Sequence, residues 1–328
     1  MTIPSPEPRT ALAHPNIAFI KYWGNRDEQL RLPASGSLSM NLGGLETVTT
    51  VQFDPSLAQD RFTLNGIDAQ PAQLQRVSAF LDLVRQRAGM KMHAGVSSEN
   101  NFPASAGIAS SSSAFAALAL AASSAAGLAL QEIELSRLAR RGSGSASRSV
   151  PGGFVEWQAA ERDEDSFAVS VALPGHWDLV DCVAIVSETA KATGSSQGHQ
   201  LAATSPLQAA RLQGAADRLV LCRQAILQKD FDALSEVTEL DCHLMHAVMM
   251  TSSPALLYWL PASLAVMQAV RSWRAIGSSA CYTLDAGPNV HVICPAIEAD
   301  RIVARLAELP GVIRVLRSGP GGPARLQD

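Results

Sequence analysis

Residues 101–113, Asn-Phe-Pro-Ala-Ser-Ala-Gly-Ile-Ala-Ser-Ser-Ser-Ser, have the composition of a phosphate-binding loop. Small residues let the backbone approach an anion, and an alanine-rich helix after them would point its first N–H groups and its dipole at that anion. The segment lacks the Gly-Lys-Ser/Thr ending of a Walker A loop, so any nucleotide would be held by a different device. A helix cap made of small packing residues is the alternative, although four consecutive serines exceed what one N-cap requires.

Lys21 lies in an otherwise apolar segment, Asn-Ile-Ala-Phe-Ile-Lys-Tyr-Trp-Gly at residues 16–24. This pattern predicts a buried strand. Desolvating an ammonium group without a partner costs several kcal/mol. We therefore expect Lys21 to meet a carboxylate or a phosphate; a solvent-facing position on an edge strand is the alternative.

The loop at residues 142–149, Gly-Ser-Gly-Ser-Ala-Ser-Arg-Ser, concentrates four hydroxyls and Arg148 without a carboxylate. Such a set of donors suits an anion, and the planar guanidinium of Arg148 could clamp a carboxylate bidentately. A surface salt bridge to one of the 30 acidic residues of the chain is the alternative.

Asp285 ends an apolar segment, Cys-Tyr-Thr-Leu-Asp, and precedes Ala-Gly-Pro-Asn. An aspartate before such a turn is either catalytic or an Asx-turn former, and the other three clusters favour the catalytic interpretation. His243 and His246 share a helix face beside Cys242, but no third ligand at useful spacing is visible, so we expect packing or hydrogen-bonding roles for them.

Composition bounds the class of protein. The chain has 328 residues, 47% of them hydrophobic and 17% charged, which predicts a folded core rather than disorder. A net charge of −4 gives no basic footprint for nucleic acid, so small-molecule partners are expected. Five cysteines without paired C-x-x-C spacing indicate reduced, buried thiols of a cytoplasmic protein. The uncharged stretch 101–131 is too rich in Ala and Ser for a membrane span, and residues 1–10 show no secretory signal.

The order of elements predicts an α+β fold with two lobes, because it lacks a regular βαβ alternation. Residues 1–180 are expected to form the N-terminal lobe, with a hairpin at Asn65-Gly66. Its other elements are a strand at 47–53, helices at 73–88, 108–128 and 133–141, and strands at 154–158 and 168–173. A further strand at 180–186 lies at the boundary with the next lobe.

Residues 181–328 are expected to form the C-terminal lobe, after a boundary between residues 174 and 195. Its β-β-α-β end resembles half of a ferredoxin-like sandwich. The apolar stretch 256–270 suits either a dimer interface or core packing. The expected elements are helices at 207–228, 231–249 and 256–275, strands at 281–284 and 290–294, a helix at 299–309 and a strand at 312–316.

Five motifs in this order resemble the mevalonate diphosphate decarboxylase family of the GHMP kinase superfamily, over nearly the whole chain. They are the segments 16–24, 32–39 (Leu-Pro-Ala-Ser-Gly-Ser-Leu-Ser), 103–111, 142–149 and 285–289. The resemblance implies a GHMP kinase fold, an active site in the cleft between the lobes, ATP and Mg²⁺ as cofactors, a phosphorylated mevalonate as substrate and a homodimer.

The resemblance also implies roles for particular residues. Asp285 would orient or deprotonate the tertiary 3-hydroxyl that attacks the γ-phosphate of ATP, Arg148 would hold the substrate carboxylate, and Lys21 would stabilise charge at the phosphoryl groups. Ser111 would bind the metal. The nucleotide would be bound by Pro103, Ala106, Gly107, Ala109, Ser110, Ser111, Ser112 and Ser196. The substrate would be bound by Tyr22, Asn25, Ser143, Ser145, Arg148 and Gln197.

Two positions depart from the family pattern. The family usually has a second lysine after Lys-Tyr-Trp-Gly, where this chain has Asn25, and some bacterial relatives have an arginine where it has Gln197. Fewer cations disfavour a diphosphate, since charge-assisted hydrogen bonds contribute roughly 1.5–3 kcal/mol each. The hypothesis is therefore decarboxylation of 5-phosphomevalonate to isopentenyl phosphate. If Lys191 or Arg26 compensates, the alternative is a diphosphomevalonate decarboxylase, and a kinase without decarboxylation is the third.

Overall fold

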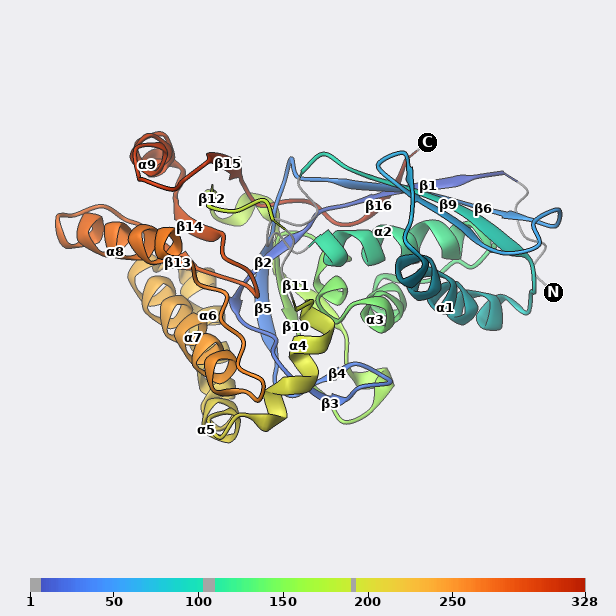
Figure 1. The fold of residues 1–328 in the computed structure, drawn as a ribbon, viewed down its shortest axis with the longest axis horizontal. Helices are drawn as coiled ribbons and strands as arrows, with labels where there is room; N and C mark the ends of the chain where they lie inside the picture. The colour runs from blue at the N-terminus through green and yellow to red at the C-terminus, as the bar shows by residue number, and fades with distance from the viewer. Residues whose placement is uncertain (1–6, 103–109, 190–192, 328) are drawn as a thin grey trace.

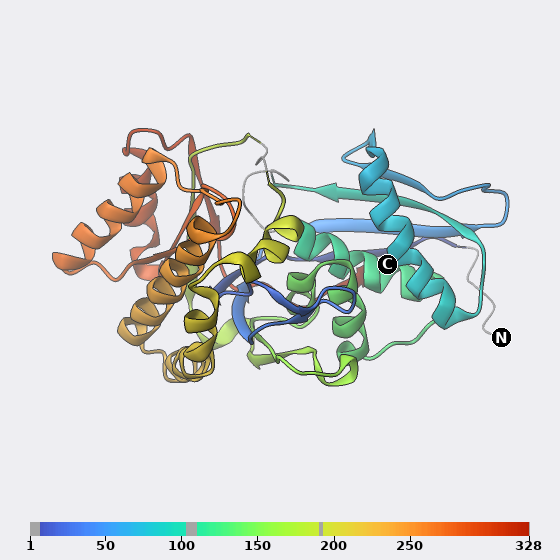
Figure 2. The same ribbon diagram turned by 60° about the horizontal axis from the view of Figure 1, so that its bottom comes forward.

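The computed structural model describes residues 7–102, 110–189 and 193–327, which form an α+β fold, as the sequence predicted. Figure 1 shows two lobes: one sheet with α1, α2 and α3 below it on one side, and α6 to α9 on the other. A second sheet stands between them, and the same arrangement is visible in the turned view of Figure 2.

The N-terminal lobe is built on a six-stranded sheet with the order β16-β1-β6-β9-β7-β8. The predicted hairpin is confirmed: Asn65 and Gly66 have φ values of 52° and 75°, as a two-residue turn of the right twist requires. The strands are β16 (Arg325–Gln327), β1 (Arg9–Ala13), β6 (Thr47–Asp54), β9 (His93–Asn100), β7 (Arg61–Leu64) and β8 (Ile67–Asp68).

Three helices pack below this sheet: α1 (Pro71–Ala88), α2 (Ser110–Ala125) and α3 (Glu132–Gly142). The helix predicted at 73–88 is confirmed as α1, and its apolar stripe of Val77, Phe80, Leu81 and Val84 is buried in one core with α2 and the sheet. Alanines dominate α2, so the helix lies close to β1 and β6 and its N-terminal end reaches the junction of the lobes.

The middle sheet, in the order β11-β10-β5-β2, joins the lobes. Every residue of β2 (Asn16–Ile20) and β5 (Ser37–Asn41) is buried, and one core contains side chains of this sheet, of α6 (Ala215–Gln228) and of α7 (Phe231–Thr251). The remaining strands are β10 (Phe154–Trp157) and β11 (Ala168–Ala172). A residue at the end of β2 therefore lies where the two lobes meet.

The C-terminal lobe has an antiparallel sheet in the order β13-β14-β12-β15, which is the strand order of a complete ferredoxin-like sandwich. Helices α8 and α9 pack on one face, around Val266 and Ile302. Helix α7 contributes Cys242 to that core, and Leu234 and Val237 to the core on the other face. Its elements are β12 (Leu179–Ile185), α8 (Pro261–Ala275), β13 (Cys281–Thr283), β14 (Val290–Pro295), α9 (Ala296–Ala307) and β15 (Arg314–Ser318).

Several predicted boundaries differ. The helix expected at 207–228 is two helices, α5 (Gln208–Gln213) and α6, which meet at Gly214, a poor helix former. The helix expected from 256 begins at Pro261, because proline is tolerated in the first turn and not in the interior. The apolar stretch 256–270 is divided: Tyr258 and Val266 are buried within the chain, whereas Leu257 is 73% exposed.

The last strand, β16, pairs with β1, so the end of the chain returns to the N-terminal sheet. The division into 1–180 and 181–328 therefore stays a prediction for the folding units. All five cysteines are free and buried. Among the helices that the structure describes, none is both long and apolar enough to cross a bilayer.

Candidate active site at the junction of the lobes

Lys21 and Asp285 meet at the junction of the lobes. Lys21 follows the last residue of β2, its side chain is 1% exposed, and its Nζ donates to Oδ1 of Asp285 over 2.6 Å. Asp285 follows β13 by two residues, and the turn after it is closed by the backbone, from Gly287 N–H to the Asp285 carbonyl. Lys21 thus has the anionic partner that its burial requires, and the aspartate side chain faces the lysine.

The surroundings keep Asp285 ionised. Burial acts to raise the pKa of Asp285, but the charges of Lys21, His291 and Arg148 outweigh it and hold that pKa below its usual 3.8. The side chain is 25% exposed, so a ligand can reach it. A fixed carboxylate beside a fixed ammonium can orient a hydroxyl and a phosphoryl group toward each other.

Arg148 is a buried cation whose partners in the described residues are neutral. It lies in the short 3₁₀ helix Gly144–Ser149 and is 3% exposed. It donates to Oδ1 of Asn16 and to the hydroxyls of Ser37 and Ser39, over 3.1, 2.5 and 3.0 Å. Burial lowers the pKa of Arg148 to about 10, so the group is still charged at neutral pH. The surface salt bridge considered above is wrong, and the site has an unbalanced positive charge suited to a carboxylate.

Two serine segments far apart in sequence meet beside this charge. The hydroxyl of Ser111, in the first turn of α2, lies 3.1 Å from that of Ser143, which lies 3.5 Å from that of Ser145. Asn16 donates to the Ser145 carbonyl over 3.2 Å. The structure thus brings together the residue predicted to bind the metal and two predicted to bind substrate.

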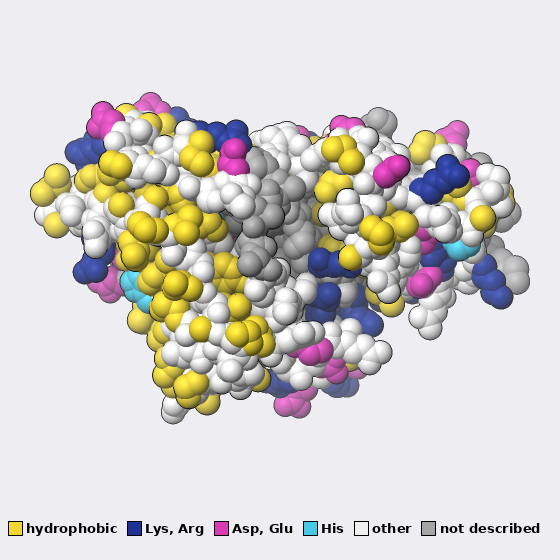
Figure 3. All heavy atoms as spheres, in the orientation of Figure 1, with side chains coloured by type: hydrophobic (Ala, Val, Ile, Leu, Met, Phe, Trp, Pro, Cys, Tyr) yellow, Lys and Arg dark blue, Asp and Glu magenta, His cyan; other side chains and the backbone are white. Residues whose placement is uncertain are grey.

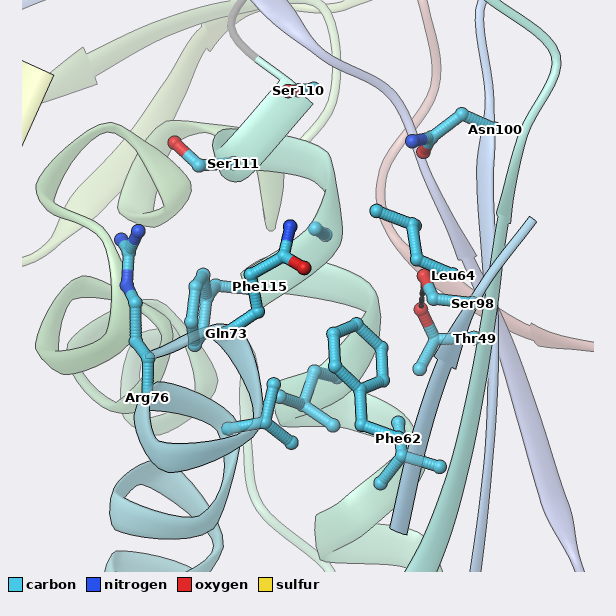
Figure 4. A pocket seen from close by; sticks show the side chains of 14 residues that line it. Thr49, Phe62, Leu64, Gln73, Arg76, Ser98, Asn100, Ser110, Ser111 and Phe115 are labelled. Atoms are coloured by element: carbon cyan, nitrogen blue, oxygen red, sulfur yellow. Dashed lines mark hydrogen bonds between the residues drawn. The ribbon is translucent and has the colours of Figure 1, made fainter. Parts of the chain in front are cut away.

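A pocket of about 220 Å³ opens between α1, the N-terminal end of α2, and strands β6, β7 and β9. Figure 4 shows Arg76 and Gln73 on its α1 side, Ser111 above them, and Thr49, Ser98 and Leu64 on the sheet side. Its lining also includes the predicted nucleotide ligand Ser110. Ser112, another predicted ligand, is fully buried and does not line this pocket. Pro103, Ala106, Gly107 and Ala109 lie outside the described residues.

Sequence reasoning missed Arg76, which stands on the side of α1 that faces this pocket. Its Nη2 donates to the Gly142 carbonyl over 2.8 Å, and its guanidinium lies 4.6 Å from the centre of the Phe115 ring. Burial and repulsion from Arg31 lower the pKa of Arg76 to about 10. A basic residue on an amphipathic helix is usually solvated, so the sequence offered no signal for it.

Tyr22 and Asn25, both predicted to bind substrate, contact each other. The hydroxyl of Tyr22 donates to Oδ1 of Asn25, and the Asn25 amide donates to Glu28 over 2.9 Å. The ring packs so closely on Gly144 that a Cβ there would lie 2.5 Å from a ring carbon, so only glycine fits. Burial raises the pKa of Tyr22 well above its usual range, so the phenol stays protonated.

Ser196 and Gln197 are exposed on the short helix α4 (Ser195–Leu201). His199 connects this helix to the Lys-Tyr-Trp-Gly motif: its Nδ1 accepts from the Gly24 N–H over 3.0 Å and its ring stacks on Tyr22, 4.1 Å between centres. Gln197 and Asn25, the two departures from the family pattern, therefore lie on neighbouring segments.

Sequence reasoning also missed a buried network below Lys21. Asp241 of α7, 0% exposed, accepts from the Lys21 N–H over 2.7 Å and from Nε of Arg218 over 2.8 Å. Arg211 donates to the Lys21 carbonyl over 2.7 Å. The network fixes the backbone on both sides of the lysine, so it sets where the ammonium points.

The two histidines of α7 make hydrogen-bond and ring contacts, and both lie against Trp259. His243 bonds the Tyr282 hydroxyl over 2.9 Å, and His246, 1% exposed, packs against Trp259 with 4.9 Å between ring centres. Nowhere in the described ranges do three His, Cys, Asp or Glu side chains gather as a metal site would need.

A ferredoxin-like lobe, a serine-rich helix start beside a pocket, and a charged centre between lobes define the GHMP kinase fold. Family models describe residues 13–168 as a diphosphomevalonate decarboxylase-like N-terminal domain and residues 182–313 as a mevalonate 5-diphosphate decarboxylase C-terminal domain. The diphosphomevalonate decarboxylase of Ganoderma lucidum is 37% identical, over 90% of this chain and 80% of its own.

Solved structures agree over the whole length. The mevalonate diphosphate decarboxylase of Staphylococcus aureus has a TM-score of 0.94 and 37% identity, over 98% of each chain. A structure described as MDDEF in complex with MVAPP, AMPPCP and magnesium has a TM-score of 0.93 and 38% identity, over 98% of this chain and 99% of that one. This chain belongs to the mevalonate diphosphate decarboxylase family.

Proposed function

We propose that this protein catalyses the ATP-dependent decarboxylation of 5-diphosphomevalonate to isopentenyl diphosphate, with release of ADP, phosphate and CO₂. The observation that carries the proposal is the Lys21–Asp285 pair beside the buried Arg148, whose hydrogen-bond partners among the described residues are all neutral. These groups match the three parts of such a substrate that must be handled together: a hydroxyl, an incoming phosphoryl group and a carboxylate.

In the proposed reaction ATP, when bound, supplies the phosphoryl group that turns the tertiary 3-hydroxyl into a leaving group. Asp285 orients that hydroxyl and accepts its proton. Because its pKa is held low, Asp285 is a weak base, which suits a phosphoryl transfer in which bond breaking leads and the proton leaves late. Lys21 offsets charge on the phosphoryl oxygens.

Arg148 would hold the substrate carboxylate for the second half of the reaction. Departure of the 3-phosphate builds positive charge at C3, and the carboxylate then loses CO₂ while its electrons form the alkene. The neutral partners of Arg148 leave its charge available for this carboxylate. Ser143 and Ser145 would line the same pocket.

The nucleotide would lie in the pocket between α1, α2 and the sheet, with its phosphates toward Ser110 and Ser111 and its base among Phe62, Leu64 and Val96. Ser111 would hold Mg²⁺, which usually keeps several waters and takes most protein-site ligands from substrate phosphates, so a single hydroxyl fits. The relative at 38% identity that is described as a complex with AMPPCP and magnesium supports ATP and Mg²⁺ as the cofactors.

The names of the relatives favour the diphosphate over the monophosphate that the sequence first suggested. Decarboxylation of 5-phosphomevalonate to isopentenyl phosphate is nevertheless a second candidate, because Asn25 and Gln197 are neutral. Arg26, considered for compensation, is committed to an exposed ion pair with Glu161 over 3.2 Å, and Lys191 lies outside the described residues.

The test is kcat/KM for CO₂ release from 5-diphosphomevalonate and 5-phosphomevalonate, measured side by side with ATP and Mg²⁺. We expect the diphosphate to be the better substrate. A preference for the monophosphate would support the second candidate, and no CO₂ from either would overturn the decarboxylase assignment.

A homodimer in the cytoplasm is proposed from the family resemblance. Apolar side chains gather over α7 and α8 in Figure 3, and Leu240, Leu257 and Leu264 are 50%, 73% and 42% exposed, which offers a face for a second copy. Light scattering of the purified protein and of Leu257→Glu tests this; a monomeric wild type would contradict it.

A further inference from the structure

The hairpin of β3 (Asn25–Asp27) and β4 (Leu32–Pro33) borders the substrate end of the site. Asn25 pairs with Pro33 across the hairpin, and the Gly24 carbonyl accepts from the Ala34 N–H over 3.1 Å. Asn25 occupies the position where the family motif has a lysine, and its amide is bonded by Tyr22 and Glu28. The hairpin therefore has no cation at the family position.

The turn of the same hairpin carries a different cation, Arg31. Its φ is 52°, in the left-handed region that non-glycine residues seldom adopt, and the turn is fastened on both sides. The Leu30 carbonyl accepts from Nε of the buried Arg140 over 3.1 Å, and the Leu30 N–H donates to Asp27 over 2.6 Å. An arginine in an unfavourable backbone conformation, on a fixed turn, has a fixed starting point for its side chain.

Arg31 has no partner of its own in the part of the chain that the structure describes: no carboxylate lies within 4.0 Å and no hydrogen bond is formed. Its side chain is partly buried. In a protein of net charge −4, most arginines can find an acid, as Arg26 does with Glu161. Figure 3 shows Lys and Arg side chains gathered in the hollow between the lobes, over the region of α3 and this hairpin.

The charge of Arg31 affects the pKa values of two residues, one on the substrate side and one on the nucleotide side of the site. It opposes the effect of burial on the pKa of Tyr22, whose ring packs on Gly144, and it helps to lower the pKa of Arg76, which lines the nucleotide pocket. Tyr22 and Arg76 both contact the segment 142–144, from the substrate and nucleotide sides respectively. Because Arg31 also lies in the turn that joins β3 to β4, it belongs to the same hairpin as Asn25, beside which an anionic substrate tail would emerge.

We propose that Arg31 binds the terminal phosphate of the substrate and so replaces, from the turn of the hairpin, the cation missing at position 25. This inference rests on the proposed function, since it names the residue that lets a neutral Asn25 coexist with a diphosphate substrate. It also assigns a function to an arginine that no ion pair with the described residues explains.

The first experiment compares Arg31→Gln with Arg26→Gln. Both lie on the same hairpin and lose one charge, but Arg26 is exposed and paired with Glu161. Arg31→Gln should lower kcat/KM for 5-diphosphomevalonate about 10- to 100-fold, the loss of one charge-assisted hydrogen bond, with a much smaller effect on 5-phosphomevalonate. Arg26→Gln should leave both within about twofold, and the KM for ATP should not change in either.

The second experiment returns the charge to the family position. The double variant Asn25→Lys with Arg31→Gln should regain most of the lost kcat/KM for the diphosphate. A purely structural role of Arg31 would not be rescued by a lysine at residue 25, so rescue separates binding from folding. Circular dichroism and thermal unfolding of each variant establish that the fold is retained.

Equal losses for both substrates, a raised KM for ATP, or no loss in Arg31→Gln would each overturn the inference. A wild type that releases no CO₂ from either substrate overturns the proposed function instead. Calorimetric binding of 5-diphosphomevalonate to wild type and Arg31→Gln then decides the inference separately: weaker binding by the variant supports it, and equal binding refutes it.

Discussion

Lys21 and Asp285, 264 residues apart in sequence, form the ion pair at the junction of the lobes, with 2.6 Å between Nζ and Oδ1. The lysine comes from the end of the middle sheet and the aspartate from the turn after β13, so the pair exists only when both lobes are folded and packed. Substrate binding in this place would depend on the whole chain.

Variants of Lys21 and Asp285 should show that the ion pair affects stability and activity in different ways. Asp285→Asn leaves Lys21, which is 1% exposed, without an anion, so the melting temperature of the variant should fall. Its rate of CO₂ release should drop by about 1000-fold or more. The double variant Lys21→Met with Asp285→Asn should regain stability and remain inactive. Thermal unfolding and CO₂ assays check this; a double variant less stable than Asp285→Asn would contradict the burial argument.

Arg148→Gln should bind the substrate carboxylate more weakly than the wild type. Two charge-assisted hydrogen bonds at roughly 1.5–3 kcal/mol each predict a fall in kcat/KM of about 100-fold or more. The fold should survive, because burial already disfavours the charged group. The measurement is the shift in melting temperature on adding 5-diphosphomevalonate, which we expect in wild type and not in the variant. A full shift in Arg148→Gln would show that another residue holds the carboxylate.

Asp241→Asn tests the network below Lys21. Removing the negative charge leaves Arg211 and Arg218 buried without an anionic partner. Breaking a buried ion pair in this way costs about 3–5 kcal/mol of unfolding free energy. The exposed pair of Arg26 and Glu161 is the matched control, and Arg26→Ala should change stability by less than about 1 kcal/mol. Denaturant unfolding compares them; similar small effects would mean that water reaches the Asp241 network.

His246 should make the fold sensitive to acid. Burial, together with the charge of Lys21, lowers the pKa of His246 to about 3, although Asp285 acts in the opposite direction and His243 also lies nearby. Between pH 6.5 and 3 the unfolded chain therefore binds a proton that the folded chain does not, so stability is present above pH 6.5 and is lost as the pH falls. The cost at pH 5 is about 2 kcal/mol.

His246→Gln cannot take up that proton, so its unfolding free energy should change less than that of wild type between pH 7 and pH 5. Parallel denaturant titrations at the two values measure the difference. An identical pH dependence would show that His246 is protonated in the folded protein or hydrated.

Much of this arrangement could be predicted from local sequence patterns. The apolar stripe of α1, the Asn65-Gly66 turn and the need of Lys21 for an anion each depend on residues close in sequence or on one buried group. Half of the ferredoxin-like sandwich also follows, because β13, β14, α9 and β15 appear in the chain as a β-β-α-β pattern. The place of β12 between β14 and β15 does not follow, because that pairing joins segments far apart in sequence.

The buried network and the nucleotide-side arginine could not be predicted in the same way. Asp241 looks like an ordinary helix residue until Arg211 and Arg218 pack against it, and its bond to the Lys21 backbone joins residues 220 apart. Arg76 occupies the side of an amphipathic helix that normally faces water, and only the packing of α1 against Gly142 and Phe115 gives it a site. Single charged residues that pair only in the folded chain produce no periodic pattern in the sequence, so their contacts could not be predicted from it.

The most direct test of the proposed reaction is the ratio of CO₂ to ADP formed during turnover of 5-diphosphomevalonate. Decarboxylation coupled to phosphoryl transfer predicts equal amounts of the two products in the wild type, and neither above background in Asp285→Asn. ADP formed without CO₂ would contradict it and would make the protein a kinase of the same fold.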